Sequence, residues 1–272
     1  MSHAVRVAVV ACLLVTAGCA GFVGQETDES GTVAPALEGT PTPTFGERLP
    51  PGVTAASVDA RTLAAAHRSE VVPFSRTTTT RLRFVAANGT VLGAGLYTTK
   101  TEYVGENTRV LVRTNTTGTA PRTVGITPAD TTYWGNETVS ASRQVANETI
   151  ELGFRRGPLP PAIRADTTGE SLVFLVFSSV NLTDVEPIGT VNGRERFRLR
   201  GSGSNVSILR GFNVSLVATV DELGVVREAR FAYTTTRDGQ PIRVIREFRL
   251  TGQKNTTAPP PEWVETARRS AN

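Results

Sequence analysis

Residues 225–250, with the sequence VVREARFAYTTTRDGQPIRVIREFRL, decide the fold. The turn pair Asp238-Gly239 divides this stretch into two segments rich in valine, isoleucine and aromatic residues, which is typical of a β-hairpin. Because side chains alternate along a strand, the second segment places four apolar residues on one face: Ile242, Val244, Phe248 and Leu250. Arg246 interrupts that face. This stretch therefore predicts paired antiparallel strands.

The same composition continues toward the N-terminus. Turn signals at Asn88-Gly89, Gly135-Asn136 and Asn192-Gly193 separate short segments rich in Thr, Val, Arg and aromatic residues. The segments that we predict as strands are 81–85, 91–97, 109–113, 133–134, 139–144, 149–153, 195–200, 214–220, 225–235 and 242–250. The predicted fold class is therefore mainly β (α+β), built on an antiparallel sheet.

Two helices are expected beside the sheet. The first covers residues 58–72, with Ser57 as its cap and His67 as a packing or surface residue rather than a ligand. The second covers residues 168–180 and contains the apolar run 172–177, which has no alternation and therefore also fits a buried strand. We favour the helix, because Thr167-Thr168-Gly169-Glu170 fits a capping box.

The N-terminus has the pattern of an exported lipoprotein. Arg6 precedes an apolar run that is too short to span a bilayer, which needs about 20 residues, and small residues precede Cys19. A cysteine directly after Ala17-Gly18 resembles the lipobox of bacterial and archaeal lipoproteins, in which that cysteine carries lipid. An ordinary secretory peptide is the alternative. The sequence thus predicts a signal peptide over residues 1–18 and a protein anchored to the outer face of the membrane through Cys19.

The polar composition after Cys19 sets the domain boundaries. Residues 19–48 are rich in Gly, Thr, Pro and Glu and are predicted to form a disordered tether. A single antiparallel β domain is expected over residues 49–265, followed by a polar tail over residues 266–272. Trp263 is expected to dock on the edge of the domain.

Charge and cysteine content exclude several classes of protein. The net charge of +4 falls to +3 once Arg6 is removed, which is too small an excess to favour nucleic acid. Cys12 leaves with the signal peptide, so the mature chain has no disulfide. Eight Asn-X-Ser/Thr sequons make N-glycosylation an expectation for an exported chain: Asn88, Asn115, Asn136, Asn147, Asn181, Asn205, Asn213 and Asn255.

The processed chain lacks the residues that most catalytic sites need. It retains no free thiol, one histidine and two lysines, and it has no Gly-rich phosphate loop and no Cys/His cluster. We therefore predict no enzyme, no cofactor and no metal site. A pair of carboxylates remains conceivable for glycoside hydrolysis, although no pair is singled out among Asp166, Glu170, Asp184, Glu186, Asp221 and Glu222.

The order of these features resembles a family of archaeal, haloarchaeal-type surface lipoproteins and, more distantly, lipoprotein carriers of the LolA and LppX kind. The resemblance covers residues 49–265 and is clearest where Leu49-Pro50-Pro51-Gly52-Val53 leads into the helix segment 63–67. The basic charge departs from haloarchaeal habit. The resemblance implies a curved antiparallel sheet, or half-barrel, that wraps around helices and leaves an apolar concavity for acyl chains.

Two further sets of residues are candidate contact sites. The apolar run offers a possible lining for a lipidic ligand, at Leu172, Phe174, Leu175 and Phe177, although filling the core is the alternative. Four arginines share one face of a strand and would meet an anionic partner, unless acids on a neighbouring strand such as Glu228 balance them: Arg194, Arg196, Arg198 and Arg200. The favoured function is non-catalytic binding or carriage of an apolar ligand. The alternatives are a structural or adhesive envelope component and, third, a glycan-active enzyme.

Overall fold

The computed structural model describes residues 49–104, 106–119, 129–146, 148–164, 167–206 and 210–271. Cys19, the predicted signal peptide and the whole predicted tether lie outside these residues. The helices are α1 (Ala60–Val71), α3 (Pro161–Arg164), α4 (Glu170–Phe177) and α5 (Trp263–Ser270). The strands are β1 (Arg76–Ala86), β2 (Val91–Val104), β3 (Asn107–Gly118), β4 (Asp130–Gly135), β5 (Val139–Ala146), β6 (Thr149–Arg156), β7 (Asn181–Val191), β8 (Arg194–Val206), β9 (Gly211–Asp221), β10 (Val226–Arg237) and β11 (Gln240–Thr251).

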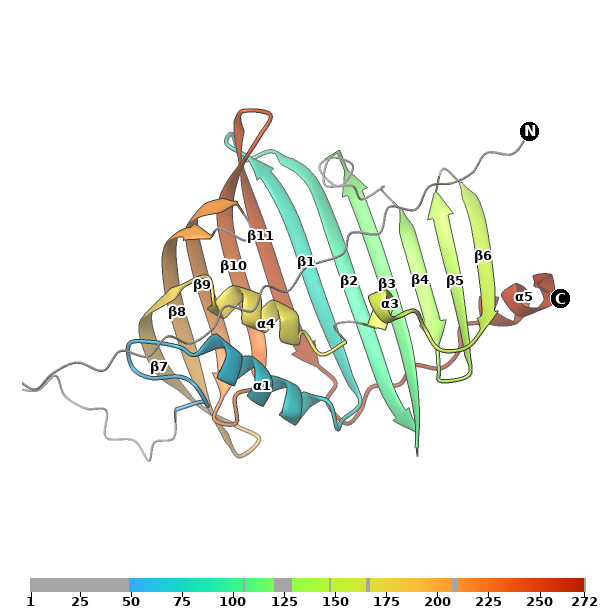
Figure 1. The fold of residues 1–272 in the computed structure, drawn as a ribbon, viewed down its shortest axis with the longest axis horizontal. Helices are drawn as coiled ribbons and strands as arrows, with labels where there is room; N and C mark the ends of the chain where they lie inside the picture. The colour runs from blue at the N-terminus through green and yellow to red at the C-terminus, as the bar shows by residue number, and fades with distance from the viewer. Residues whose placement is uncertain are drawn as a thin grey trace, which may run out of the picture. The chain divides into compact units, whose positions relative to one another are not determined.

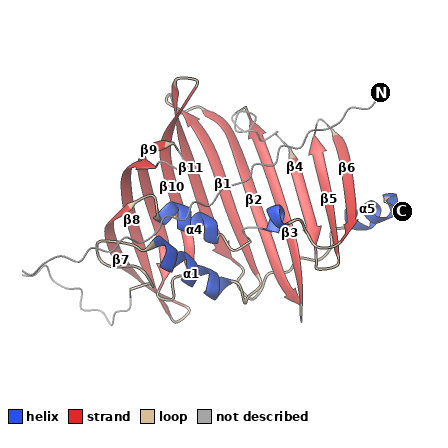
Figure 2. Cartoon of the chain, in the orientation of Figure 1, coloured by secondary structure: helices blue, strands red, loops and turns tan. Residues whose placement is uncertain are grey.

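The described strands form one curled, open sheet of 11 strands (Figures 1 and 2). Its order is β6-β5-β4-β3-β2-β1-β11-β10-β9-β8-β7, so two meanders meet where the first strand pairs with the last. β1 and β11 run antiparallel, with Thr80 opposite Phe248. The predicted mainly antiparallel, curved sheet is confirmed.

Two of the predicted turn pairs, Asp238-Gly239 and Asn192-Gly193, form tight β-hairpin turns. Asp238 and Gly239 have φ of 47° and 75°, and Asn192 and Gly193 have φ of 55° and 74°. Positive φ at both central residues is the type I′ geometry, whose twist matches that of the flanking strands. These two turns therefore set the register of the β10–β11 and β7–β8 hairpins.

Helices α1 and α4 cover one face of the sheet over β11 and its neighbours, and we call this the helical face (Figure 1). Alternate residues of the strands point into this core, as Leu82 and Phe84 of β1 do. The other members come from α1, α4 and β7 to β11 and include Leu63, Val71, Val173, Phe177, Leu199, Leu216, Phe231, Val244 and Phe248. These side chains pack the two helices against the half of the sheet that is formed by β1 and β7 to β11.

The chain after β11 packs against the opposite, outer face of the other half. The Trp134 indole N–H donates to the Ala258 carbonyl at 3.0 Å, and the Ala258 amide donates to Glu102 Oε2 at 2.8 Å. α5 then contacts β5 and β6. A second core forms there from Leu111, Trp134, Ala141, Ala258 and Val264. Trp263 lies partly buried against this core, so its predicted docking is confirmed.

The structure corrects several predicted boundaries. α1 begins after Asp59, whose carboxylate accepts from the amides of Arg61 and Thr62, so the cap is Asp59 and not Ser57. The second helix is confirmed but is confined to α4, and it begins after Gly169 at φ 86° with no side-chain cap. The predicted capping box is wrong, because the Thr168 hydroxyl only accepts from the Glu170 amide in a local turn.

Three elements had no prediction from the sequence. These are β7, whose acidic and proline-containing sequence weakens the strand pattern, the short α3, and α5. α5 runs through Ser270 with Ala267 buried, so the packed chain continues beyond the predicted boundary at residue 265. None of the described helices has the length and apolar character needed to cross a membrane.

His67 joins α1 to the sheet and to the segment before α4. Its ring is fully buried, its Nδ1 accepts the Val226 amide at 3.1 Å, and its Nε2 lies 2.9 Å from the Thr168 carbonyl. An Nδ1 that accepts leaves the proton on Nε2, so the ring is neutral. Burial lowers the pKa of His67 to about 4. The predicted packing role is therefore confirmed.

This shifted pKa predicts a loss of stability in acid. The unfolded chain protonates His67 near pH 6.5 and the folded chain near pH 4, so stability is retained above pH 6.5 and falls between these values. The shift corresponds to about 3 kcal/mol of unfolding free energy. His67→Gln does not titrate and should remove this part of the pH dependence. Urea unfolding of both proteins across this range checks the prediction, which fails if their pH profiles are parallel.

Candidate functional site

Among the described residues, α1 and α4 do not cover the half of the sheet formed by β2 to β6. The described part of the segment that contains α3 lies in front of these strands (Figures 1 and 2). Two pockets lie along this segment, with volumes of about 480 Å³ and about 200 Å³, and both are lined by Leu159. The larger has the size of an ordinary small-molecule site, about 300–1,000 Å³.

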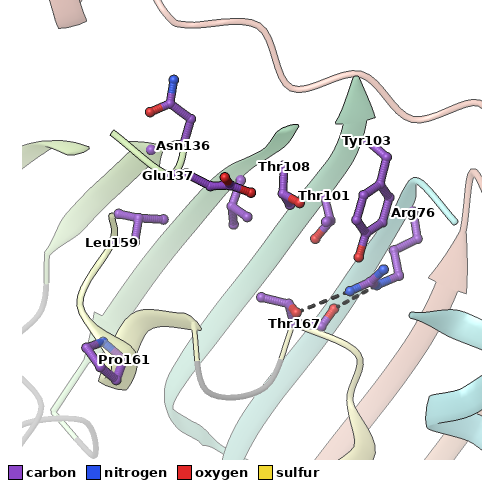
Figure 3. Close-up of a pocket in the computed structure, with 11 residues that line it drawn as sticks. Arg76, Thr101, Tyr103, Thr108, Asn136, Glu137, Leu159, Pro161 and Thr167 are labelled. Atoms are coloured by element: carbon purple, nitrogen blue, oxygen red, sulfur yellow. Dashed lines mark hydrogen bonds between the residues drawn. The ribbon is translucent and has the colours of Figure 1, made fainter. Parts of the chain in front are cut away.

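We call the larger one the Arg76 pocket. Its floor is formed by neighbouring strands, because Arg76 of β1 pairs with Thr101 of β2, and Thr101 pairs with Val110 of β3. Paired residues share a face, so these side chains point the same way. Figure 3 shows Tyr103 beside Arg76, with Leu159 and Pro161 on the segment across the pocket. The lining residues are Arg76, Thr101, Tyr103, Thr108, Val110, Gly135, Asn136, Glu137, Leu159, Pro161 and Thr167.

Arg76 is a buried cation held by carbonyl groups. Its Nη1 donates to the carbonyls of Val71, Val72 and Phe74 at 2.9–3.2 Å, which caps the C-terminal end of α1. Its Nε and Nη2 donate to the carbonyl and hydroxyl of Thr167, both at 3.2 Å (Figure 3). No carboxylate among the described residues pairs with it, so the pocket keeps a positive wall.

Thr101 presents a buried hydroxyl that lacks a partner. The residue is 2% exposed, and its Oγ1 has no hydrogen bond among the described residues. A buried polar group left without a partner costs about 1–3 kcal/mol. Since Thr101 lines the pocket, a bound group can supply the missing hydrogen bond. The unpaired Thr101 hydroxyl is therefore stronger evidence for a binding site than the volume of the pocket is.

The remaining lining residues are mostly uncharged. Apolar surface comes from Val110, which lies beside Thr101 on the floor, and from Leu159 and Pro161 of the segment that contains α3. Glu137 at the exposed rim is the one carboxylate among the lining residues, and these include neither histidine nor cysteine. Across the described chain, no group of three or more His, Cys, Asp or Glu residues is arranged to hold a metal ion. The site can bind a molecule that is apolar along one side and accepts hydrogen bonds at one end.

The apolar run of α4 does not line a pocket of useful size. Phe177 is 1% exposed in the core, while Phe174 is 40% exposed on the other side of the helix. Leu172 and Phe177 border a space of only about 10 Å³, which is too small for an acyl chain, and Leu175 is half-buried. Of the four residues, Leu172 and Phe177 thus border one small space and Phe174 lies on the exposed side, while a larger pocket lies over β2 to β4. A ligand lining at these four residues stays a prediction.

The four arginines of β8 separate into two pairs. Arg198 pairs with Glu186 at 3.3 Å, and Arg200 pairs with Asp184 and Glu186, so acids of β7 balance both. The acid expected to balance them, Glu228, instead pairs with Arg249 at 3.1 Å.

Arg194 and Arg196 lie elsewhere, at the lining of a separate pocket near the end of the strand. Of the four arginines predicted to meet an anionic partner, only Arg194 and Arg196 are thus left without an acid of β7 beside them.

The candidate carboxylates for hydrolysis are spread over unrelated positions. Glu170 pairs with Arg68, Asp221 with Arg227, and Glu222 accepts the Glu195 amide. Asp184 and Glu186 pair with arginines as above, and Asp166 lies outside the described residues. Each described acid thus has a structural partner.

The described sequons differ in how accessible their asparagines are. Five asparagine side chains are exposed: Asn88, Asn115, Asn181, Asn213 and Asn255. Asn136 is half-buried, and its Oδ1 accepts from the amides of Thr138 and Val139. Asn147 and the side chain of Asn205 lie outside the described part. Glycosylation at these positions stays a prediction.

The residues of the Arg76 pocket carry almost no signal in the sequence. Arg76 and Thr101 lie in segments with many threonines, where their burial depends on α1 and on the pairing of β1 with β2. The one available hint was the lack of polar alternation in 76–80, since a run of threonines fits either face of a strand.

Comparisons with known proteins add little. No family model and no curated protein matches the chain. Among solved structures, a DUF1329 family protein from Desulfovibrio piger is similar at 12% identity and a TM-score of 0.27, over 77% of this chain and 97% of that one. The proposals that follow therefore depend on the side chains of this chain.

Proposed function

We propose that this protein is a non-catalytic, membrane-anchored binding protein that takes an apolar or lipidic ligand in the Arg76 pocket. The ligand lays its apolar body along Val110, Leu159 and Pro161 and turns an acceptor group toward Arg76 and Thr101. A fatty acid has this chemistry, since its carboxylate accepts from both a guanidinium and a hydroxyl.

The buried Thr101 hydroxyl is the observation that carries this proposal. In the free protein it is desolvated without a hydrogen bond. Arg76 Nη2 makes one hydrogen bond, to Thr167, although it has two N–H groups. An acceptor between these two atoms would satisfy both, and the apolar residues of the lining would exclude water.

Thr101→Val tests the proposal with an isosteric change. Removing a buried hydroxyl that has no partner should leave stability unchanged or raise it, while affinity for a fluorescent fatty acid should fall by about fivefold. Thr99→Val is the matched control, because Thr99 lies on the same strand and face but does not line the pocket. Fluorescence titration measures affinity, and urea unfolding measures stability.

Lack of fatty-acid binding by the wild-type chain would refute the proposal, as would equal effects of the two valine variants. The alternative would then be a structural component of the cell envelope. One observation favours that role: the space under α4 is about 10 Å³, so the core beneath this helix is filled.

The anchor is proposed at Cys19. Two hydrocarbon chains hold a protein stably on a membrane, whereas one chain or none gives weak and reversible attachment. We therefore expect Cys19→Ser to move the protein from the membrane fraction to the soluble fraction after a high-salt wash. Immunoblotting of both fractions checks this, and continued pelleting of a normally processed Ser variant would contradict it.

A further inference from the structure

A further pocket, which shares no lining residue with the Arg76 pocket, lies where β8 begins and β9 and β11 end. Its volume is about 490 Å³. We call it the cationic pocket, because four basic side chains line it: Arg194, Arg196, Arg227 and Lys254. Asp221 is the one acid in the lining. The lining therefore carries an excess of positive charge.

Asp221 neutralises only part of this charge. Its Oδ2 accepts from Arg227 Nη2 at 2.7 Å and Nε at 3.2 Å, and its Oδ1 accepts from the amides of Leu223 and Val225. Arg227 also donates to Gln253 at 2.8 Å. This acid–arginine pair thus organises the turn between β9 and β10 and leaves the other cations to face the pocket.

Arg194 and Arg196 each bury a donor that has no acceptor. Arg194 Nη1 forms long ion pairs with Asp221 at 3.6 Å and Glu70 at 3.9 Å, but both distances are too long for a hydrogen bond. Arg196 Nε is also buried without a partner, and no ion pair forms at Arg196 within the described chain. Two unsatisfied charged donors in one pocket indicate an acceptor that is supplied from outside.

The remaining cation is Lys254. Its Nζ lies 4.8 Å from the centre of the Phe74 ring, which also lines the pocket. A lysine next to an arginine pair is a common arrangement around phosphate groups, because the arginines donate in a fixed plane and the lysine adds a point charge.

We propose that the cationic pocket binds a phosphate group through Arg194, Arg196 and Lys254. Inorganic phosphate and the headgroup of an anionic phospholipid share this chemistry. The site is independent of the fatty-acid binding proposed above, because the two pockets share no lining residue.

Arg196→Gln is the decisive variant. Since Arg196 has no ion pair to lose, the change should leave folding intact but weaken phosphate binding at least tenfold. Arg198→Gln is its matched control, because it removes the same charge two residues along β8 from a side chain that pairs with Glu186 outside the pocket. Calorimetric titration of the full chain with inorganic phosphate at low ionic strength gives the affinities.

A second arm separates the two sources of phosphate. The full chain with Cys19→Ser, which has no lipid of its own, is sedimented with phosphatidylcholine vesicles that contain or lack phosphatidylglycerol. Pelleting that needs both phosphatidylglycerol and Arg196 identifies a lipid headgroup, and phosphate binding without such pelleting identifies the free ion. The proposal is overturned if neither probe binds, or if Arg196→Gln and Arg198→Gln weaken binding equally.

Discussion

Phe177→Ala is expected to lower the free energy of unfolding by about 3–5 kcal/mol. The side chain is almost completely buried, and it lies with Phe231 and Phe248 around a gap of only about 10 Å³. Truncation therefore removes a large buried apolar surface and leaves a cavity that the surrounding strands cannot close. Because a domain of this kind has about 5–15 kcal/mol of stability in total, this single change should take a large part of it.

Phe174→Ala is the matched control on the same helix. Phe174 is 40% exposed on the far side of α4, so its truncation should cost less than about 1 kcal/mol. Urea unfolding followed by circular dichroism measures both variants. Equal losses would mean that α4 does not present Phe177 to the core. The contrast also separates packing from ligand binding, since neither residue lines the Arg76 pocket.

The sheet could be predicted because its signals are local. Alternation in segments such as 242–250, and turn pairs such as Asp238-Gly239, depend on neighbouring residues alone. β7 was not predicted as a strand, because its acids pair with arginines of β8 and this contact is visible only once the two strands lie side by side. α5 was not predicted, because its few apolar residues form a recognisable buried face only when they pack on the second core at the outer face of the sheet.

The candidate site could not be predicted, because its residues become unusual only through tertiary contacts. Arg76 is an ordinary arginine in sequence and becomes a buried cation when α1 ends beside β1. The arginines of β8 show the same limit. Their spacing predicted one stripe, but the partners on β7 and at Asp221 decide which pair stays available to a ligand.

Arg76→Met is expected to cost about 3–5 kcal/mol of unfolding free energy. Methionine fills much of the same space but donates no hydrogen bond, so the carbonyls of Val71, Val72, Phe74 and Thr167 lose their shared donor. The Val71 carbonyl keeps the Phe74 amide as a donor at 3.3 Å. Each buried acceptor that is left without any donor costs roughly 1–3 kcal/mol, and water from the adjoining pocket recovers part of this. The loss of a cation at the C-terminal end of α1 adds to the cost.

Two controls show whether the guanidinium itself is responsible. Arg76→Lys keeps the positive charge but has three donors on a single atom, so it should reach fewer of these carbonyls and lose an intermediate amount of stability. Arg81→Met makes the same change on the same strand, at a side chain that is largely exposed on the outer face, and should stay within about 0.5 kcal/mol of wild type. Urea unfolding of the three variants gives the order. If Arg76→Met were as stable as Arg81→Met, the hydrogen bonds of Arg76 would not hold α1 to the sheet, and the positive wall of the pocket would lose its structural support.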